Sequence, residues 1–101
     1  MHVISRPTLR DFCKSHADAK EWLEAWLHVA ARATWKSLDD VRCSYPGADQ
    51  VGSCLVFDKG NDYRLIVRVS YANQRTRGTL FLKHFLTHAE YDKNRWKDCC
   101  T

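Results

Sequence analysis

The chain has 101 residues, of which 45% are hydrophobic and 28% charged, with a formal net charge of +4. This balance is typical of a folded globular protein and excludes an intrinsically disordered chain. No apolar run approaches the ~18 residues that a membrane-spanning helix needs. The first ten residues also lack the apolar core of a secretory signal. We therefore expect a cytoplasmic protein with a single domain over residues 1–101.

The surplus of positive charge lies entirely in the second half of the chain. Residues 1–50 carry seven basic and seven acidic side chains, whereas residues 51–101 carry nine basic and five acidic ones. Such an asymmetry favours an anionic partner such as nucleic acid, although solvated strands also carry arginines for solubility.

The five cysteines are odd in number and form no CxxC pair, which argues against a disulfide framework or a zinc ribbon. We expect reduced thiols, with Cys13 and Cys54 in or near the core and with Cys99 and Cys100 on a loose tail. The spacing of cysteines and histidines matches no common zinc module, so the sequence indicates no metal and no cofactor.

The first predicted elements are a possible short strand at residues 2–4 and a helix. Ser5 can cap this helix, and Pro7 already has a helical φ. Apolar residues then recur at the i, i+3, i+4 spacing of one helical face. The pattern predicts a helix that begins after Ser5 and ends near His16.

A second, amphipathic helix is predicted from Asp18 to about Ala33. Its apolar residues recur at i, i+4, i+7 and i+8, so its tryptophans are assigned to the core and not to a binding surface. A brief third helix begins with a capping-box-like segment at residues 37–40. It should end before Tyr45, because the proline and glycine that follow break the helical pattern.

The hydrophobic period then changes from helical to two. The predicted elements are a strand at residues 55–57, a turn at 59–62, a strand at 63–71, a basic loop at 73–78 and a strand at 79–86. Helices followed by an antiparallel meander predict an α+β fold, in which N-terminal helices pack on one face of an antiparallel β-sheet.

The strand at residues 63–71 alternates strictly, which sorts its side chains onto two faces. Arg64 and Arg68 share one face with Ile66 and Ser70. At ~3.3 Å per residue the two arginines stand ~13 Å apart, a distance comparable with the spacing of phosphates along an extended single strand. They either bind a nucleic-acid backbone or belong to an ordinary solvated sheet face.

The strand at residues 79–86 is expected to alternate in the same way. Its predicted faces are Phe81, Lys83 and Phe85 on one side and Leu80, Leu82 and His84 on the other. If Lys83 faces the same way as the two arginines, the sheet presents three cations on one side. His84 would then lie on the core face as a satisfied buried or edge histidine.

The segment Leu86–Lys93, LTHAEYDK, gathers titratable side chains where the last strand ends. His88 has a reference pKa of ~6.5 and can act as a general acid or base. Tyr91 offers a ring for stacking a base and a phenolic proton, while Glu90 and Asp92 could orient His88 or a basic neighbour. Such a set suits metal-free RNA cleavage, which requires a base for the 2′-OH, cations for the phosphorane and an acid for the leaving oxygen.

Several segments resemble the HigB family of toxins, within the RelE-like superfamily of bacterial toxin–antitoxin systems. The similarity is carried by RPTLRDF, by Trp35–Lys36, by VFDKGNDYRLIVRVSY and above all by THAEYDK, in order over nearly the whole chain. It implies a RelE-like toxin domain that cleaves messenger RNA during translation on the ribosome, without a metal. It also implies inhibition by a HigA-like helix-turn-helix antitoxin, through which any contact with operator DNA would be indirect.

The resemblance also implies a role for each residue of the predicted site. The implied catalytic residues are His88, Tyr91, Lys83 and Asp92, and the implied RNA-binding residues are Arg64, Arg68 and Lys93. His88 is the expected proton-transfer group, with Tyr91 stacking on a base or helping as an acid. The family usually has arginine where Lys83 stands, glycine where Leu86 stands and a large apolar residue where His84 stands.

Two other classes of function remain open at this point. The same superfamily includes gyrase-poisoning toxins of the ParE type, which need no acid–base pair of the kind that His88 and Tyr91 would form. A non-catalytic module that binds RNA or the ribosome would use the basic second half equally well. Substitution of His88 separates these classes, because one neutral imidazole adds little affinity for phosphate.

Overall fold

The computed structural model describes residues 1–60 and 62–100, with their side chains except those of residues 98–100. In chain order the elements are β1 (His2–Ile4), α1 (Arg6–Ser15), η1 (Ala17–Ala19), α2 (Lys20–Arg32), α3 (Leu38–Ser44), β2 (Asp49–Val51), β3 (Cys54–Lys59), β4 (Tyr63–Ser70), β5 (Thr79–Thr87), α4 (His88–Asp92) and η2 (Arg95–Cys100). Within the described residues, no helix is both long enough and apolar enough to cross a membrane.

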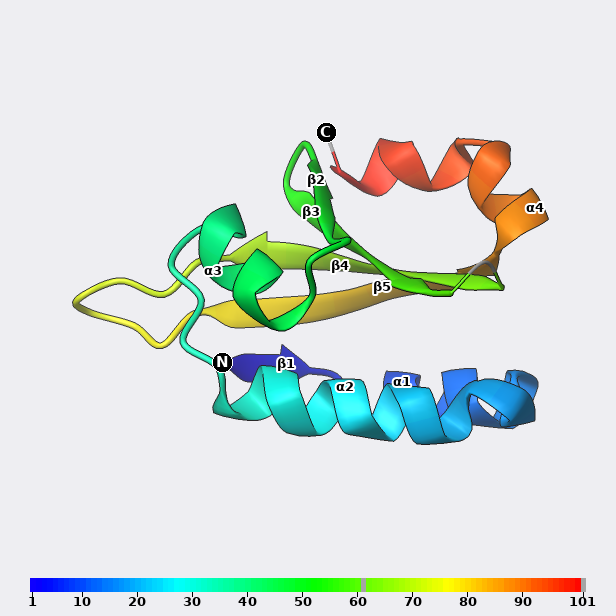
Figure 1. Cartoon of the computed structure of the whole chain (residues 1–101), viewed down its shortest axis with the longest axis horizontal. Helices are drawn as coiled ribbons and strands as arrows, with labels where there is room; N and C mark the ends of the chain where they lie inside the picture. Colours follow the sequence, from blue (N-terminus) through cyan, green and yellow to red (C-terminus); the bar gives the residue numbers. More distant parts are fainter. Residues whose placement is uncertain (61, 101) are drawn as a thin grey trace.

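The strands form one five-stranded sheet in the order β1-β5-β4-β3-β2. Neighbouring strands are antiparallel except β1, which pairs in parallel with β5. Figure 1 shows α1 and α2 on one side of this sheet, while α4 and η2 lie on the other. The predicted α+β fold is confirmed, and the parallel edge strand makes the sheet mixed.

Two of the N-terminal helices, α1 and α3, begin where their capping residues predict. The Ser5 side chain accepts a hydrogen bond from the backbone N–H of Thr8 at 3.2 Å, and a proline occupies the first turn of α1. Ser37 caps α3 in the same way, by accepting from the N–H of Asp40. Local side-chain hydrogen bonds therefore mark the starts of these two helices.

The main core lies between α2, α3 and the helix-side face of the sheet. The most deeply buried side chains there are Trp26, Phe57, Leu23, Leu55, Leu65, Leu80, Val41 and Val67. Phe57 lies at its centre, with ring centroids 5.5 Å from Trp26, 5.9 Å from Trp35 and 5.2 Å from Tyr45. The tryptophans of α2 are thus packing residues, as their helical spacing predicted.

The pairing of β4 with β5 contains an irregularity that the sequence did not reveal. Ile66 lies opposite His84, but its neighbour Val67 lies opposite Leu82. Lys83 is therefore an extra residue, the mark of a β-bulge. Because the side-chain period of a strand is two, one extra residue exchanges the faces of every side chain beyond it.

The bulge makes the predicted faces of the last strand wrong after Leu82. Phe85 was expected on the face of the strand away from Leu80 and Leu82, yet it packs with both in the main core. His84 was expected on that core face, yet it lines a cleft with Trp96 on the other side of the sheet. This reversal changes which residues of β5 can take part in a site.

Gly78 is required where the loop after β4 enters β5. Its φ is +80°, and an added Cβ would lie 2.7 Å from the backbone nitrogen of Ala72 and 2.8 Å from the carbonyl oxygen of Ser70. The carbonyl of Gly78 also accepts a hydrogen bond from the backbone N–H of His2. Only glycine combines this conformation with such a close approach of backbones.

The cysteines follow the prediction only in part. Cys13 and Cys43 are free thiols. Cys54 is fully buried at the start of β3, but it is disulfide-bonded, so the expectation of a reduced thiol there is wrong. Sequence spacing does not report which residues meet through the fold. The expectations for Cys99 and Cys100 fall on side chains outside the description.

Candidate functional site

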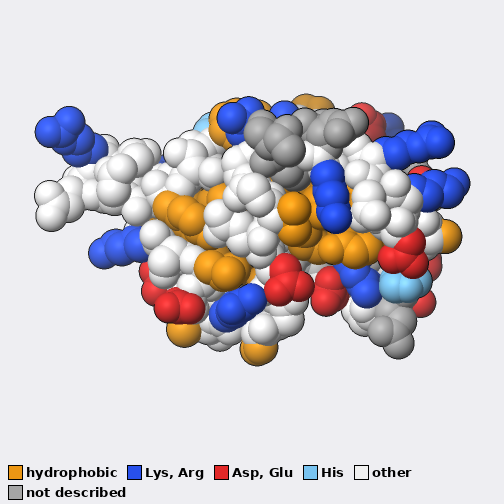
Figure 2. Space-filling model, turned by 90° about the horizontal axis from the view of Figure 1, so that it is seen from above, with side chains coloured by type: hydrophobic (Ala, Val, Ile, Leu, Met, Phe, Trp, Pro, Cys, Tyr) orange, Lys and Arg blue, Asp and Glu red, His pale blue; other side chains and the backbone are white. Residues whose placement is uncertain are grey.

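The face of the sheet turned away from α1 and α2 carries the predicted site, and we call it the site face. It includes Arg64, Ile66 and Arg68 of β4, and α4 and η2 lie over one part of it (Figure 1). Figure 2 looks onto this face and shows apolar side chains along its middle, with basic side chains beside them. Acidic side chains lie along the lower edge of this view, and a histidine lies towards its right end.

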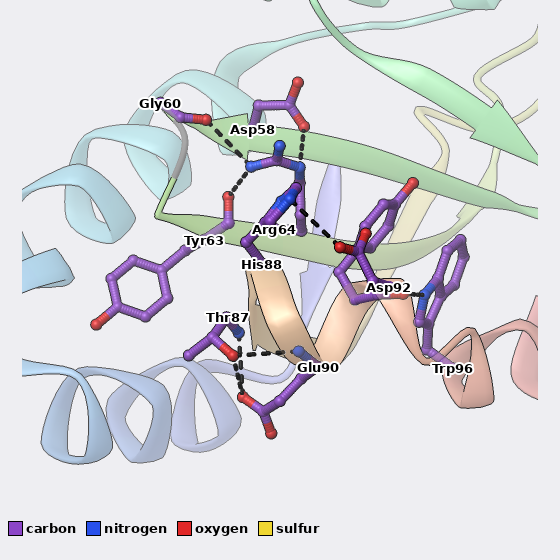
Figure 3. Close-up of polar contacts among 10 residues, drawn as sticks. Asp58, Gly60, Tyr63, Arg64, Thr87, His88, Glu90, Asp92 and Trp96 are labelled. Carbon is purple, nitrogen blue, oxygen red and sulfur yellow. Dashed lines mark hydrogen bonds and ion pairs between the residues drawn. The ribbon is translucent and has the colours of Figure 1, made fainter.

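The residues His88–Asp92 form the short helix α4, and Thr87 is its N-cap. The Thr87 hydroxyl accepts a hydrogen bond from the N–H of Glu90, while the Glu90 carboxylate accepts one from the N–H of Thr87 at 3.1 Å (Figure 3). This reciprocal capping box fixes the start of α4. The hydrogen bonds from Thr87 hold the pKa of Glu90 below its usual value. Glu90 therefore organises the helix, and it does not orient His88.

Asp92 is the partner of His88. The His88 Nε2 lies 3.3 Å from the Asp92 Oδ2, one helical turn further along α4 (Figure 3). Both side chains are more than half exposed, so the pair is open to a ligand from solvent. A carboxylate in this position holds the imidazole in one orientation.

Tyr91 is held between an arginine and a tryptophan. Its ring stacks on Trp96 with centroids 5.0 Å apart and planes inclined by 14°, and the Arg64 guanidinium carbon lies 5.7 Å from its centroid. Burial raises the pKa of Tyr91, and the carboxylates of Asp49 and Asp58 raise it further. The phenol therefore keeps its proton at neutral pH.

The position of Trp96 depends on a reversal of the chain after α4. Asn94 has a φ of +61°, a left-handed conformation that asparagine tolerates better than most residues. The Trp96 indole N–H then donates to the Tyr91 carbonyl at 3.0 Å. Trp96 is buried in a small cluster with Cys54, Val56 and Ile66, which ties the C-terminal segment to the sheet.

Arg64 is engaged inside the protein. Its Nε lies 2.9 Å from the Asp58 Oδ1, and its Nη1 donates to the carbonyls of Gly60 and Tyr63 (Figure 3). Only 13% of its side chain is exposed. Arg64 thus packs against the Tyr91 ring, and its binding of phosphate stays a prediction.

The other predicted cations are exposed. Arg68 lies on the site face opposite Phe81, and Lys83 lies in the bulge at the level of Ile66 and Val67, between the two arginines of β4. Lys93 follows α4 directly and is also exposed. The structure thus brings His88, Tyr91, Asp92 and Arg64 together at one end of the site face, with further cations nearby.

Sequence reasoning missed three residues of this region. Asp58 lies directly opposite Arg64 on β3, and the short turn between their strands was the signal that could have paired their charges. Trp96 is a single aromatic residue in a polar segment, so no hydrophobic periodicity indicated which face it would occupy. His84 was assigned to the wrong face because the bulge was not foreseen. Among the described residues, no group of three or more His, Cys, Asp or Glu side chains could hold a metal ion.

Helices packed on one face of a small sheet, with the His88–Asp92 pair and exposed cations on the other, are consistent with a RelE-like toxin. The model of the HigB toxin family, described as the RelE-like toxic component of a toxin–antitoxin system, matches residues 19–94. The chain belongs to this family.

Curated relatives extend the similarity beyond the matched segment. The mRNA interferase HigB of Escherichia coli O6:H1 is 27% identical over 97 residues, which cover 92% of this chain and 90% of the relative. The mRNA interferase toxin HigB of Escherichia coli K12 is 25% identical over 96 residues, with 91% and 88% covered. A Shigella flexneri mRNA interferase HigB matches to the same extent.

Proposed function

We propose that this protein is an endoribonuclease that cleaves messenger RNA while it is translated on the ribosome. The observation that carries the proposal is the His88–Asp92 pair, which stands open to solvent beside the protonated phenol of Tyr91. The relatives are mRNA interferases, which supports the same reaction and substrate.

The chemistry that we propose needs only side chains. His88 removes the proton of a ribose 2′-OH, and Asp92 stabilises the imidazolium that forms. The oxygen attacks the adjacent phosphate, and Lys83 and Arg68 offset the charge that develops on the phosphorane. Tyr91 stacks on a base or donates its proton towards the leaving 5′-oxygen.

The partners follow from the same proposal. The protein would act in the cytoplasm, on the ribosome, and its toxicity would be neutralised by a HigA-like helix-turn-helix antitoxin. Contact with operator DNA would pass through that antitoxin. The exposed cations Arg68, Lys83 and Lys93 support an RNA substrate, because phosphate contacts by Lys and Arg supply most of the sequence-independent affinity.

The test is induction of the protein alone, with 5′-end mapping of cellular transcripts, beside His88→Ala and Tyr91→Phe. His28→Ala is the matched control, because His28 is equally a histidine on a helix surface but lies on α2, away from the site face. We expect growth arrest and new ends within translated codons for the wild type and for His28→Ala. His88→Ala should abolish both, and Tyr91→Phe should weaken both because it keeps the stacking but loses the proton.

Two outcomes would contradict the proposal. Cleavage that persists in His88→Ala would remove the proposed base from the reaction. Arrest with intact transcripts and an induced DNA-damage response would indicate a gyrase poison instead.

A further inference from the structure

A groove runs along the outer side of α1 and α2, which cover the side of the sheet opposite to the site face (Figure 1). We call it the helix groove. It consists of three adjoining hollows with volumes of about 490, 320 and 320 Å³. Arg6 lines all three hollows, Leu27 lines two of them and Ala31 lines two. The hollows therefore form one continuous depression.

The floor of the helix groove is apolar. It includes Cys13 of α1 together with Leu27 and Ala31 of α2, all of which are half-buried. Burial raises the pKa of the Cys13 thiol, and the Glu24 carboxylate raises it further, while Lys20 acts in the opposite direction. The thiol consequently stays neutral at physiological pH. A half-buried apolar floor of this kind suits the side chains of another protein, because apolar contacts form the centre of most protein–protein interfaces.

The rim of the helix groove is strongly basic. Five exposed cations line it: Arg6, Arg10, Lys14, Lys20 and Arg32. Among the residues that the structure describes, none of these five side chains forms an ion pair with a carboxylate. The acidic side chain that lines the same hollows is Glu24. Unpaired cations around an apolar floor favour a partner surface that is apolar in the middle and acidic at its edges.

The length and shape of the helix groove suit an α-helix. Its lining residues on α2 extend from Lys20 to Arg32, which corresponds to ~18 Å at a rise of ~1.5 Å per residue. A partner helix of about three turns covers this distance. A groove between two helices also accepts the apolar face of a third helix, with residues at i, i+3, i+4 and i+7 as its anchors.

We infer that the helix groove binds an amphipathic α-helix of a partner protein, with the apolar stripe of that helix on the floor and its acidic flanks facing the cations of the rim. Nucleic acid fits this groove less well, because a sugar–phosphate backbone gains nothing from an apolar floor. The inference goes beyond the proposed function, and it does not depend on it, since the groove and His88 lie on opposite sides of the sheet.

The probe for the test is a designed peptide of about sixteen residues, a length at which an isolated helix can form. It carries leucines along one helical face, glutamates on both flanks of that face and a fluorescein label. A second peptide has lysine in place of every glutamate. Fluorescence anisotropy measures the Kd, and the protein carries His88→Ala in all cases so that cells can produce it. We expect the acidic peptide to bind at least about tenfold more tightly than the basic one.

Two pairs of variants locate the binding. Arg10→Glu/Lys14→Glu reverses two charges of the rim and should raise the Kd of the acidic peptide about tenfold or more. Its control, Lys36→Glu/Arg75→Glu, makes the same change of net charge at two exposed cations that line none of the three hollows, and should raise the Kd less than about twofold.

The second pair tests the floor. Ala31→Gln places a longer side chain on the floor and should weaken binding about fivefold or more. Ala25→Gln, on an exposed position of α2 outside the groove, should leave the Kd unchanged. Circular dichroism establishes that all variants are folded, and NMR titration should shift the amides of α1 and α2 but not those of β4 and β5.

Selective binding of the acidic peptide, weakened by the groove variants and not by their controls, supports the inference. Absence of binding, or equal binding of the acidic and basic peptides, overturns it. So does single-stranded RNA whose affinity falls tenfold in Arg10→Glu/Lys14→Glu, roughly the change expected of the peptide, because the groove would then belong to nucleic acid. A protein that is dimeric by light scattering and becomes monomeric in Ala31→Gln also overturns it, since a second copy would then occupy the groove. None of these results alters the test of the proposed function, which follows cleavage and His88.

Discussion

The two faces of the central sheet are built from the same strands but are stabilised in different ways. On the helix side, leucines, valines and aromatic rings form a continuous core with α2 and α3. On the site face, the buried cluster of Cys54, Val56, Ile66 and Trp96 is small, and ion pairs and capping contacts hold the surrounding groups. Stability thus resides mainly on one face, while the other can expose polar groups to a ligand.

The comparison also shows how one extra residue lets β5 contribute side chains to both the core and the site face. Up to Leu82 the even-numbered side chains of β5 face the helix side of the sheet. After the bulge at Lys83 the odd-numbered side chains face that side. Phe85 consequently completes the core while His84 joins the site face. If the comparison is correct, substitutions on the helix side should unfold the protein, and those on the site face should mainly change its chemistry.

The largest effect is expected at the centre of the helix-side core. Phe57→Ala should lower the free energy of unfolding by about 3–5 kcal/mol, because it leaves a cavity among three aromatic rings. Urea denaturation followed by circular dichroism measures the change. Val29→Ala, on the exposed side of α2, should change stability by less than about 0.5 kcal/mol. If Phe57→Ala lowers the free energy of unfolding by less than about 1 kcal/mol, roughly the size of an ordinary surface effect, the helix-side face is not the main source of stability.

A smaller and more local effect is expected from Trp96→Ala. The substitution should cost about 1–3 kcal/mol, because Trp96 joins only a small cluster and the last segment of the chain. Hydrogen exchange should show faster opening of α4, whereas the amides of β4 and β5 should keep their protection. If the amides of β4 lose protection equally, the two faces form a single cooperative unit and the comparison fails.

Asp58→Asn should affect the reaction more than the fold. It removes the carboxylate that holds the Arg64 Nε, so Arg64 no longer supports Tyr91 rigidly. We expect cleavage to fall about tenfold with RNA affinity nearly unchanged, and the stability change to stay below about 1 kcal/mol. Single-turnover cleavage and equilibrium binding distinguish the two quantities. Asp11→Asn, an exposed aspartate on α1, is the control, and equal losses in both variants would argue against a positioning role.

The smallest effect concerns the capping box of α4. The pKa of Glu90 is lowered by its hydrogen bonds with Thr87, so its contribution is present above the usual pKa of a glutamate and is lost as the pH falls through the lower folded value. For this exposed group we expect about 0.5 kcal/mol or less. NMR titration of the Glu90 carboxyl and of the α4 amides should show both changing together. In Glu90→Gln the α4 amide signals should no longer change with pH in this range, whereas in Glu21→Gln on α2 they should change as in the wild type.

The parts of the fold that sequence predicted are those with local causes. The caps at Ser5 and Ser37 and the period-two pattern of β4 depend on residues close in the chain, and each was placed within a residue or two. The bulge at Lys83 has no such local signal, because it exists only in the register of β5 against β4. The short strand β2 was missed because only one of its three residues, Val51, is apolar.

The residues of the candidate site also fall into those that local sequence predicts and those that it does not. His88, Tyr91 and Asp92 lie within one short segment, so their types and spacing were enough to bring them together. Asp58 reaches the site through strand pairing, and Trp96 reaches it through the reversal at Asn94. Neither can be predicted without knowing the path of the chain, because residues far apart in sequence become neighbours only through tertiary structure.

The parallel pairing of β1 with β5 has a consequence for synthesis of the protein. His2 pairs with Thr79, so the first strand waits for its partner until most of the chain has left the ribosome. Contacts between such distant segments form slowly, because a long loop must close before they contribute. Since α4 follows β5 directly, the proposed chemistry appears only when the sheet can be completed. A nascent chain that stops in the loop before β5 would lack both the strand that joins β1 to β4 and the helix α4 that carries the proposed site.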